Sequence, residues 1–188
     1  MTQHEQKRAA KKGQSLGGFE SRDVAEVLDA LVGVRYWLDG GWGVDALLGR
    51  QTREHDDLDV AIDRADLIEA TRRLADVGFT HAPEVEPGLP ARYVVRDRRD
   101  RQVDLHPLTF DENGDGWQEL PEARRGLYPG RQLDAVGKIG GRQVPCISAE
   151  LQLEHHSGYE PTQRDLNDTI ALAERFDLEL PETLETWL

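Results

Sequence analysis

Two features between residues 36 and 63 restrict what this chain can fold into: a glycine pair and, after a short spacer, two aspartates one residue apart. The pair is Gly40-Gly41, and the aspartates are Asp57 and Asp59, which alternate with apolar residues. This period of two is typical of a strand with one face in the core, so both carboxylates are expected on the same open face of a sheet. The upstream glycines predict a turn whose backbone N–H groups can approach a phosphate.

Two carboxylates held side by side repel each other unless a cation neutralises them, and oxygen ligands favour Mg²⁺ or Mn²⁺ over zinc. The segment Val103-Asp104-Leu105-His106 alternates in the same way, so we expect Asp104 and His106 to face the pair. Three convergent carboxylates suit nucleotidyl transfer: two hold the metal, and the third accepts a proton or shares a second metal. The alternative, solvated charges at a strand edge, does not account for the glycine pair.

The remaining pattern predicts an α+β protein with a small mixed sheet flanked by helices and with helices at the C-terminus. Residues 1–18 are predicted to be a disordered tail, residues 19–147 the core, and residues 148–188 a helical segment packed on that core within a single domain. Residues 111–130 are expected to be mostly loop. The first predicted helix begins near Ser21, and further helices are predicted over residues 42–48, 65–77, 148–156 and 162–176. Strands are predicted over residues 36–38, 58–62, 92–96, 101–105, 133–139 and 142–147.

The composition limits the classes of molecule that the protein is expected to bind and the compartment in which it is expected to work. The net charge is −13, which disfavours nucleic acid and favours a cationic small molecule or a basic protein, unless the charge only maintains solubility. The single cysteine, Cys146, excludes an intrachain disulfide, and its apolar neighbours predict a buried, inert thiol. The sequence contains neither an apolar run long enough to span a membrane nor the apolar core of a signal peptide, so a cytoplasmic protein is expected.

The run GGWGVDALLGRQTREHDDLDV resembles the signature of the nucleotidyltransferase superfamily, and most closely that of the antibiotic nucleotidyltransferases. The segments YWLDGGWGVD, TREH, DLDV, DLHPLTFDENGDG and VPCISAELQLEHHSGYE are similar to the small lincosamide nucleotidyltransferases. The aminoglycoside 2″-nucleotidyltransferase family has a similar Gly-Gly-Trp…Asp-Asp-x-Asp segment. The resemblance covers about Tyr36 to Asp168. It implies a nucleotidyltransferase-type sheet and a two-metal, Mg²⁺-dependent transfer of a nucleoside monophosphate. The transferred group is usually AMP, with ATP as its donor. An antibiotic hydroxyl is the acceptor, and pyrophosphate is released.

The resemblance also implies roles for individual residues. Gly40 and Gly41 match the turn that contacts phosphate, Asp57 and Asp59 match the metal-binding pair, and Asp104 matches the third carboxylate, which we take as the candidate general base and metal ligand.

Four further residues are candidates, and three of them, Arg53, His106 and Tyr159, keep two interpretations each. Arg53 and His55 lie on the loop that enters the acidic strand, where Arg53 suits either a nucleotide phosphate or a salt bridge with a nearby acid. His106 either touches substrate and tunes Asp104 or is structural. Tyr159 either stacks on a nucleobase and lines the acceptor site or packs in the core. Two other acids nearby, Asp45 and Asp56, are expected to be structural and to point away, respectively.

Two competing metal motifs are weaker. Residues 111–122 fit the EF-hand calcium loop, but a strand precedes them and no helical pattern brackets them. His155 and His156 are adjacent and are expected to point to different sides of a helix, which does not suit a zinc pair.

Three function classes follow. The first is an O-adenylyltransferase that inactivates a lincosamide or an aminoglycoside, with an antibiotic and an NTP as its partners and a homodimer as one way to complete the acceptor pocket. The second is an antitoxin-type nucleotidyltransferase that modifies a partner protein. The third is a nucleotide-binding module without turnover, which the intact set of three acids argues against.

Overall fold

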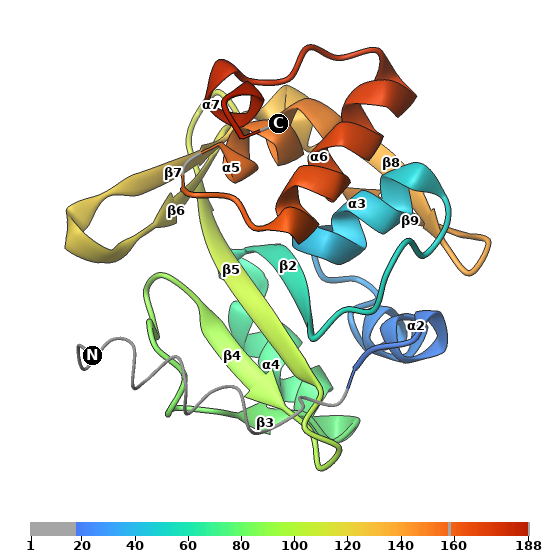
Figure 1. Ribbon diagram of the computed structural model, residues 1–188. Helices are drawn as coiled ribbons and strands as arrows, with labels where there is room; N and C mark the ends of the chain where they lie inside the picture. The colour runs from blue at the N-terminus through green and yellow to red at the C-terminus, as the bar shows by residue number, and fades with distance from the viewer. Residues whose placement is uncertain (1–17, 158, 188) are drawn as a thin grey trace, which may run out of the picture.

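The fold is given by a computed structural model that describes residues 18–157 and 159–187. Within these residues the strands form one mixed sheet in the order β3-β4-β5-β2-β1-β9-β8, and a hairpin of β6 and β7 extends from β5 (Figure 1). The strands are β1 (Tyr36–Leu38), β2 (Asp57–Asp63), β3 (Thr80–His81), β4 (Tyr93–Arg96), β5 (Gln102–Phe110), β6 (Gly116–Glu119), β7 (Arg125–Tyr128), β8 (Ala135–Ile139) and β9 (Arg142–Cys146).

Six α-helices are described: α2 (Ser21–Ala30), α3 (Gly40–Leu48), α4 (Leu67–Asp76), α5 (Ala149–His156), α6 (Gln163–Phe176) and α7 (Glu182–Glu185). Side chains that bond to free backbone N–H groups begin several of them. Asp39 accepts from Gly40 N at the start of α3, Ser148 accepts from Leu151 N in α5, and Thr162 forms a capping box with Asp165 in α6.

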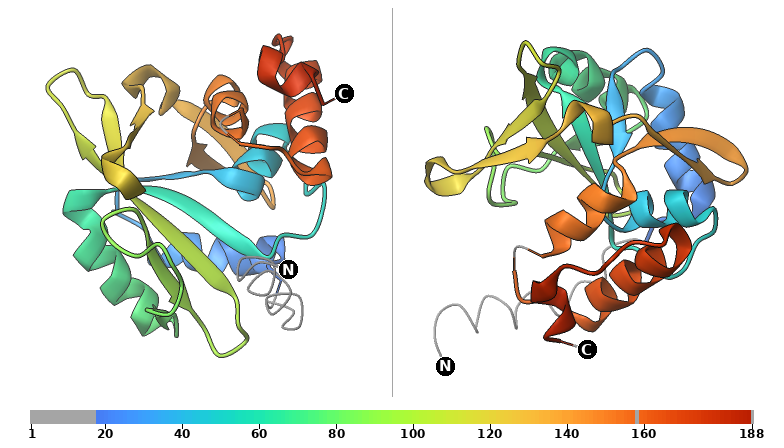
Figure 2. Two further views of the ribbon diagram at one scale, coloured as in Figure 1. Left: turned by 60° about the vertical axis from the view of Figure 1, so that its left-hand side comes forward. Right: turned by 90° about the horizontal axis from the view of Figure 1, so that it is seen from above.

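One face of the sheet packs in the hydrophobic core, and the other carries polar residues. Leu58 and Val60 of β2 point into the main core with Val103 and Leu105 of β5, and α2 and α4 cover this face. The opposite face carries the polar residues of the same two strands and is partly covered by α5, through Leu151. Figure 2 shows the C-terminal helices on one side of the sheet and α4 on the other. The alternation in the sequence therefore separates a core face from a polar face.

Most of the predicted elements are confirmed, and the fold class is α+β with C-terminal helices as expected. The glycine pair is an exception: it is not a turn but the first turn of α3 itself. The prediction of a loop over residues 111–130 is wrong, because β6 and β7 pair there. The short elements β3 and α7 were not predicted. The predicted disordered tail lies outside the described residues, except for Gly18.

Two smaller predictions also have outcomes. Cys146 is buried, as predicted, and burial raises the pKa of its thiol to about 12. None of the described helices combines the length and the apolar character needed to cross a bilayer.

Candidate active site

The three predicted carboxylates come together on the polar face of β2 and β5. These strands are parallel neighbours, and Asp59 lies directly opposite Asp104 in the register, with Asp57 two pairs away, opposite Gln102. Burial, followed by the charges of Asp59 and Asp104, raises the pKa of Asp57 to about 7. The three carboxyl groups thus oppose one another's ionisation. A divalent cation bound here would stabilise their ionised forms.

Asp104 is the least accessible of the three acids. Its side chain is only 1% exposed. Arg92 Nη1 donates to Oδ2 at 2.5 Å, and Gln102 Nε2 donates to Oδ1 at 2.7 Å. Burial and the charge of Asp59 raise its pKa, and the charge of Arg92 opposes them. Asp104 therefore lies behind the cleft wall, within reach of Asp59 but held by two donors.

The glycines at the start of α3 form the wall opposite the acids. A Cβ on Gly40, whose φ is +55°, would lie 2.3 Å from Oδ2 of Asp59. A Cβ on Gly41 would lie 2.3 Å from Nδ1 of His55 and 2.7 Å from Nη2 of Arg53. Only glycine allows this approach. The N-terminus of a nine-residue helix is thereby brought against the aspartates, and such a terminus attracts phosphate.

A cleft of about 460 Å³ opens between these walls and the C-terminal helices. The far wall comes from α5, α6 and their connection, through His155, His156, Tyr159 and Asp165. Both histidines thus line the cleft, contrary to the expectation that they point to different sides. They nevertheless have different partners: Nδ1 of His155 lies 3.8 Å from Asp39, and Nε2 of His156 lies 3.8 Å from Asp165.

A chain of hydrogen bonds crosses the floor of the cleft and includes residues that the sequence pattern did not single out. His106 Nε2 lies 3.1 Å from Oδ1 of Asp59, and Gln118 Nε2 bonds to Nδ1 of His106 at 2.9 Å. Tyr128 Oη lies 3.2 Å from Oε1 of Gln118 and donates to Oδ2 of Asp39 at 3.0 Å. The chain therefore links Asp59 to Asp39, the residue that caps α3.

The charges along this chain support one another. Burial lowers the pKa of His106, but its hydrogen bond to Asp59 and the charge of Asp59 outweigh burial and raise it. Burial raises the pKa of Asp39, but the neighbouring His155, the charge of His106 and the N–H of Gly40 outweigh burial and hold it well below its usual value.

Arg53 and His55 are both at the cleft, and each already has a carboxylate partner. Arg53 Nη2 lies 2.8 Å from Oδ2 of Asp168 on α6, so the arginine forms a salt bridge, but with a distant acid and not with one of the nearby acids. His55 is 2% exposed, and its Nε2 lies 2.5 Å from Oδ2 of Asp45. Asp45 also accepts from Thr52 and is fully buried, as a structural acid should be. Asp56 points outward and pairs with Arg164 instead.

The EF-hand interpretation is not supported by the geometry. Asp111 accepts backbone N–H groups of Asn113 and Asp115 through Oδ1 and the indole N–H of Trp117 through Oδ2. The loop then continues straight into β6, so Glu122 stands at the far end of a strand rather than over the loop.

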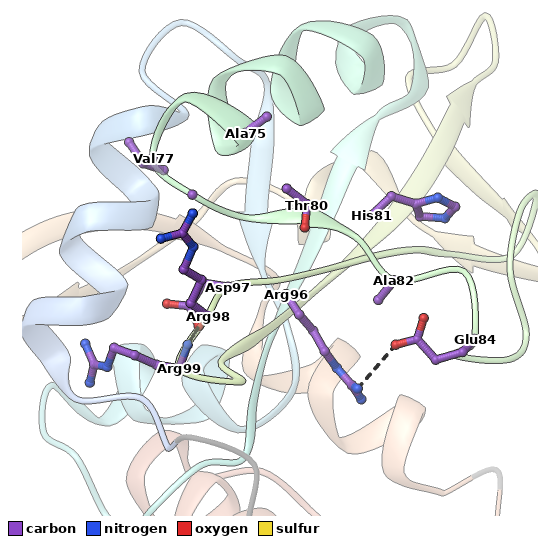
Figure 3. Close-up of a pocket in the computed structure, with 11 residues that line it drawn as sticks. Ala75, Val77, Thr80, His81, Ala82, Glu84, Arg96, Asp97, Arg98 and Arg99 are labelled. Atoms are coloured by element: carbon purple, nitrogen blue, oxygen red, sulfur yellow. Dashed lines mark hydrogen bonds and ion pairs between the residues drawn. The ribbon is translucent and has the colours of Figure 1, made fainter.

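A larger cavity of about 690 Å³ lies at the other end of the sheet, beside β3 and the C-terminus of α4 (Figure 3). Its charged lining consists of Arg96 of β4, Arg98 and Arg99 of the β4–β5 turn, Asp97 and Glu84. It contains no pair of convergent carboxylates, so the chemistry belongs to the smaller cleft.

The donor set fits magnesium bound together with a nucleotide. Among the residues that the structure describes, no group of three or more His, Cys, Asp or Glu side chains is arranged to hold a metal ion. Mg²⁺ does not need one, since it commonly takes one or two carboxylates and completes its shell with phosphate oxygens and water. Asp57 and Asp59 supply such a pair beside an anion-attracting helix terminus.

Comparison with known proteins agrees with this geometry. A lincosamide resistance protein of Staphylococcus haemolyticus is 35% identical over 133 residues, which cover 70% of this chain and 80% of that protein. A 2″-aminoglycoside nucleotidyltransferase of Klebsiella pneumoniae is 33% identical over 61% of this chain, and the match spans only 58% of that protein.

Solved structures show the same fold. The crystal structure of a lincomycin-bound lincosamide antibiotic adenylyltransferase aligns with a TM-score of 0.71 at 33% identity, covering 82% of this chain and 97% of that one. A 2″-aminoglycoside enzyme in complex with adenylyl-2″-tobramycin aligns with a TM-score of 0.67 at 21% identity, covering 88% of this chain and 92% of that one. The model of the aminoglycoside-2″-adenylyltransferase family matches residues 22–172. The chain is therefore a nucleotidyltransferase that belongs to the aminoglycoside-2″-adenylyltransferase family.

Proposed function

We propose that this enzyme transfers AMP from Mg²⁺-ATP to a hydroxyl group of a lincosamide antibiotic and releases pyrophosphate. The observation that carries the proposal is the register of β2 and β5, which sets Asp59 beside Asp104 directly across from the N-terminus of α3. This arrangement offers cation ligands and a phosphate-binding surface in one cleft, with a proton acceptor directly behind the cleft wall.

The nucleotide side of the site comprises α3, β2 and the loop between them. The backbone at Gly40 and Gly41 faces the triphosphate, and Arg53 adds a guanidinium at the edge of the cleft while its other side is held by Asp168. Asp57 and Asp59 would hold Mg²⁺, which, when bound, neutralises the phosphate oxygens and stabilises the charge that develops during transfer. His106 orients Asp59 through their hydrogen bond.

Asp104 is our candidate for the general base. The acceptor hydroxyl oxygen bonds to the α-phosphorus, the bond to pyrophosphate breaks, and the hydroxyl proton moves to Asp104. A raised pKa suits this task. Each carboxylate oxygen has two lone pairs, so one donor on each oxygen leaves acceptor capacity. Arg92 is a positioning residue, since its hydrogen bond to Oδ2 fixes the orientation of the Asp104 carboxylate and so determines which lone pairs can accept the proton.

The acceptor class is inferred from two considerations. Lincosamide enzymes are 33% and 35% identical to this chain over most of their own length, which supports a lincosamide over an aminoglycoside. The cleft also carries Asp39 and Asp165 on its acceptor side, and carboxylates there attract the basic amine of such an antibiotic.

The test is pyrophosphate release with Mg²⁺-ATP against a panel of lincosamides and aminoglycosides, followed by mass spectrometry of the products. We expect a lincosamide to gain one AMP. The Asp59→Asn variant serves as the inactive control, and omission of Mg²⁺ tests the metal requirement. Modification of aminoglycosides alone would contradict the acceptor assignment, and no modification in either class, with ATP still bound, would redirect the search toward a protein acceptor.

A further inference from the structure

A second cavity, of about 560 Å³, adjoins the catalytic cleft on its C-terminal side. Its walls are the connection between α5 and α6 and the short terminal helix α7. The lining includes the residues Tyr159, Glu160, Glu182, Thr183, Thr186 and Trp187. This group is called the α7 pocket below.

The α7 pocket borders the cleft at Tyr159. Tyr159 lines both cavities, with one part of its side chain near His156 and Asp165 and 52% of its surface exposed. A ligand that lies in the cleft and extends past Tyr159 would therefore enter the α7 pocket. The acids of β2 lie in the cleft itself, so the α7 pocket can hold only a part of a substrate that does not react.

The lining selects for positive charge and an apolar surface. Two carboxylates, Glu160 and Glu182, face the pocket, and none of its described lining residues is basic. Trp187 is 50% exposed and presents a second aromatic surface beside that of Tyr159. Aromatic faces together with carboxylates attract an alkylated ammonium group, whereas they repel a polyphosphate.

The α7 side of the pocket lies outside the residues that the family model matches, whereas Tyr159 and Glu160 lie inside them. The family match ends at Leu172, within α6, and α7 begins only at Glu182. The residues of α7 can therefore differ between members without disturbing the acids, the glycines or the sheet.

We propose that the α7 pocket is an acceptor subsite that binds the basic, partly apolar portion of the antibiotic while its hydroxyl lies at Asp104. This inference rests on the proposed function for the identity of the acceptor. It assigns to Trp187 and Glu182 a role in substrate specificity, with no part in the chemical step.

The test compares Trp187→Ala, Trp187→Phe and Glu182→Gln with the unchanged enzyme, and uses Glu112→Gln, on the exposed turn after β5, as a control for loss of one surface charge. We expect Trp187→Ala to raise the KM for lincomycin about tenfold, which lies between the values for an exposed and a fully desolvated cation–π contact, with little change in kcat or in the KM for ATP. Trp187→Phe should restore most of the affinity. Glu182→Gln should raise the same KM, and Glu112→Gln should not.

An unchanged KM for lincomycin in both Trp187→Ala and Glu182→Gln would overturn the subsite, and so would an equal rise in the KM for ATP, which would point to the nucleobase. If no antibiotic is adenylylated, calorimetry with lincomycin and a non-hydrolysable ATP analogue separates the two proposals. Weaker lincomycin binding by Trp187→Ala would then support the pocket although the proposed reaction had failed. Equal binding by both proteins, or none, would overturn it.

Discussion

Arg53 and Asp168 form a two-point ion pair, in which Nε and Nη2 of the guanidinium lie 3.2 and 2.8 Å from the same carboxylate oxygen. The pair joins the loop that enters β2 to the middle of α6. It is one of the direct links between the acidic strand and the C-terminal helices, and it holds the planar guanidinium at the rim of the cleft.

Replacing Asp168 by Asn should lower the free energy of unfolding by about 2 kcal/mol, because a charged partner of a half-buried guanidinium is lost. The KM for ATP should also rise, since Arg53 is no longer held in place. Urea denaturation and steady-state kinetics measure the two effects. Glu174→Gln, an exposed change on the same helix, should shift stability by less than about 0.5 kcal/mol. Equal stabilities for the two variants would show that the pair contributes nothing.

Asp57→Asn and Asp59→Asn should each lower turnover at least about a hundredfold, because the cation loses a ligand. Neither variant should unfold. Asp57→Asn in particular should melt at the same or a higher temperature without metal, since neutral Asn removes both the burial of a charge and the repulsion by Asp59 and Asp104, which together raise the pKa of Asp57 to about 7. The neighbouring Asp56→Asn is the control and should keep full activity. Substantial turnover in either metal-site variant would mean that the cation is held elsewhere.

Gly40→Ala should abolish turnover, and Gly140→Ala provides a matched control. Both glycines have φ near +55°, at 55° and 56°, but only Gly40 faces a side chain, that of Asp59. Each alanine should cost about 1–2 kcal/mol of stability from backbone strain. Loss of activity beyond that, measured as kcat at a temperature where both variants are folded, should occur for Gly40→Ala alone. Similar kinetics in the two variants would contradict the close approach of α3 to the acids.

Asp104→Asn should reduce kcat by about 10²- to 10⁴-fold, the usual contribution of a general base, and leave the Kd for ATP nearly unchanged. Rapid-quench kinetics and calorimetry with a non-hydrolysable nucleotide provide the two numbers. An equal loss of nucleotide affinity would instead identify Asp104 as mainly a metal ligand.

The ion-pair cluster around Asp23 should make stability depend on pH in the acid range. Burial raises the pKa of Asp23, but the N–H of Glu20 and the guanidinium groups of Arg99 and Arg101 outweigh burial, so the pKa lies below its ordinary value of 3.8. The unfolded chain then binds the proton more readily than the folded one. The stabilisation is fully present above the unfolded pKa and is lost as the pH falls through the folded value.

Urea titrations of the unchanged protein and of Asp23→Asn, from neutral pH into the acid range, test this expectation. The difference in the free energy of unfolding should shrink toward acid pH. A difference that stays constant would show that Asp23 has the same pKa in both states.

The strands that carry the acids could be predicted from sequence because Leu58, Val60, Val103 and Leu105 alternate with polar residues. The β6–β7 hairpin could not, since its strands GWQE and RGLY each include a glycine, and they pair because β5 offers an edge. The pair Arg53–Asp168 spans 115 residues, so no local pattern announces it.

The role of Asp39 was missed for a related reason. Before the structure it is one acid in front of a glycine pair, with the properties of an ordinary helix cap. In the fold, Tyr128 and His155, which are distant in the sequence, contact Asp39, and together these residues line the cleft.

Asp39 also has a thermodynamic consequence. Its carboxylate receives the N–H at the start of α3 on one oxygen and the hydroxyl of Tyr128 on the other. A ligand that displaces Tyr128 therefore disturbs the Asp39 carboxylate, which caps the N-terminus of α3 that faces the nucleotide. Linkage requires any such effect to be reciprocal, so antibiotic and nucleotide would alter each other's affinity by one common factor.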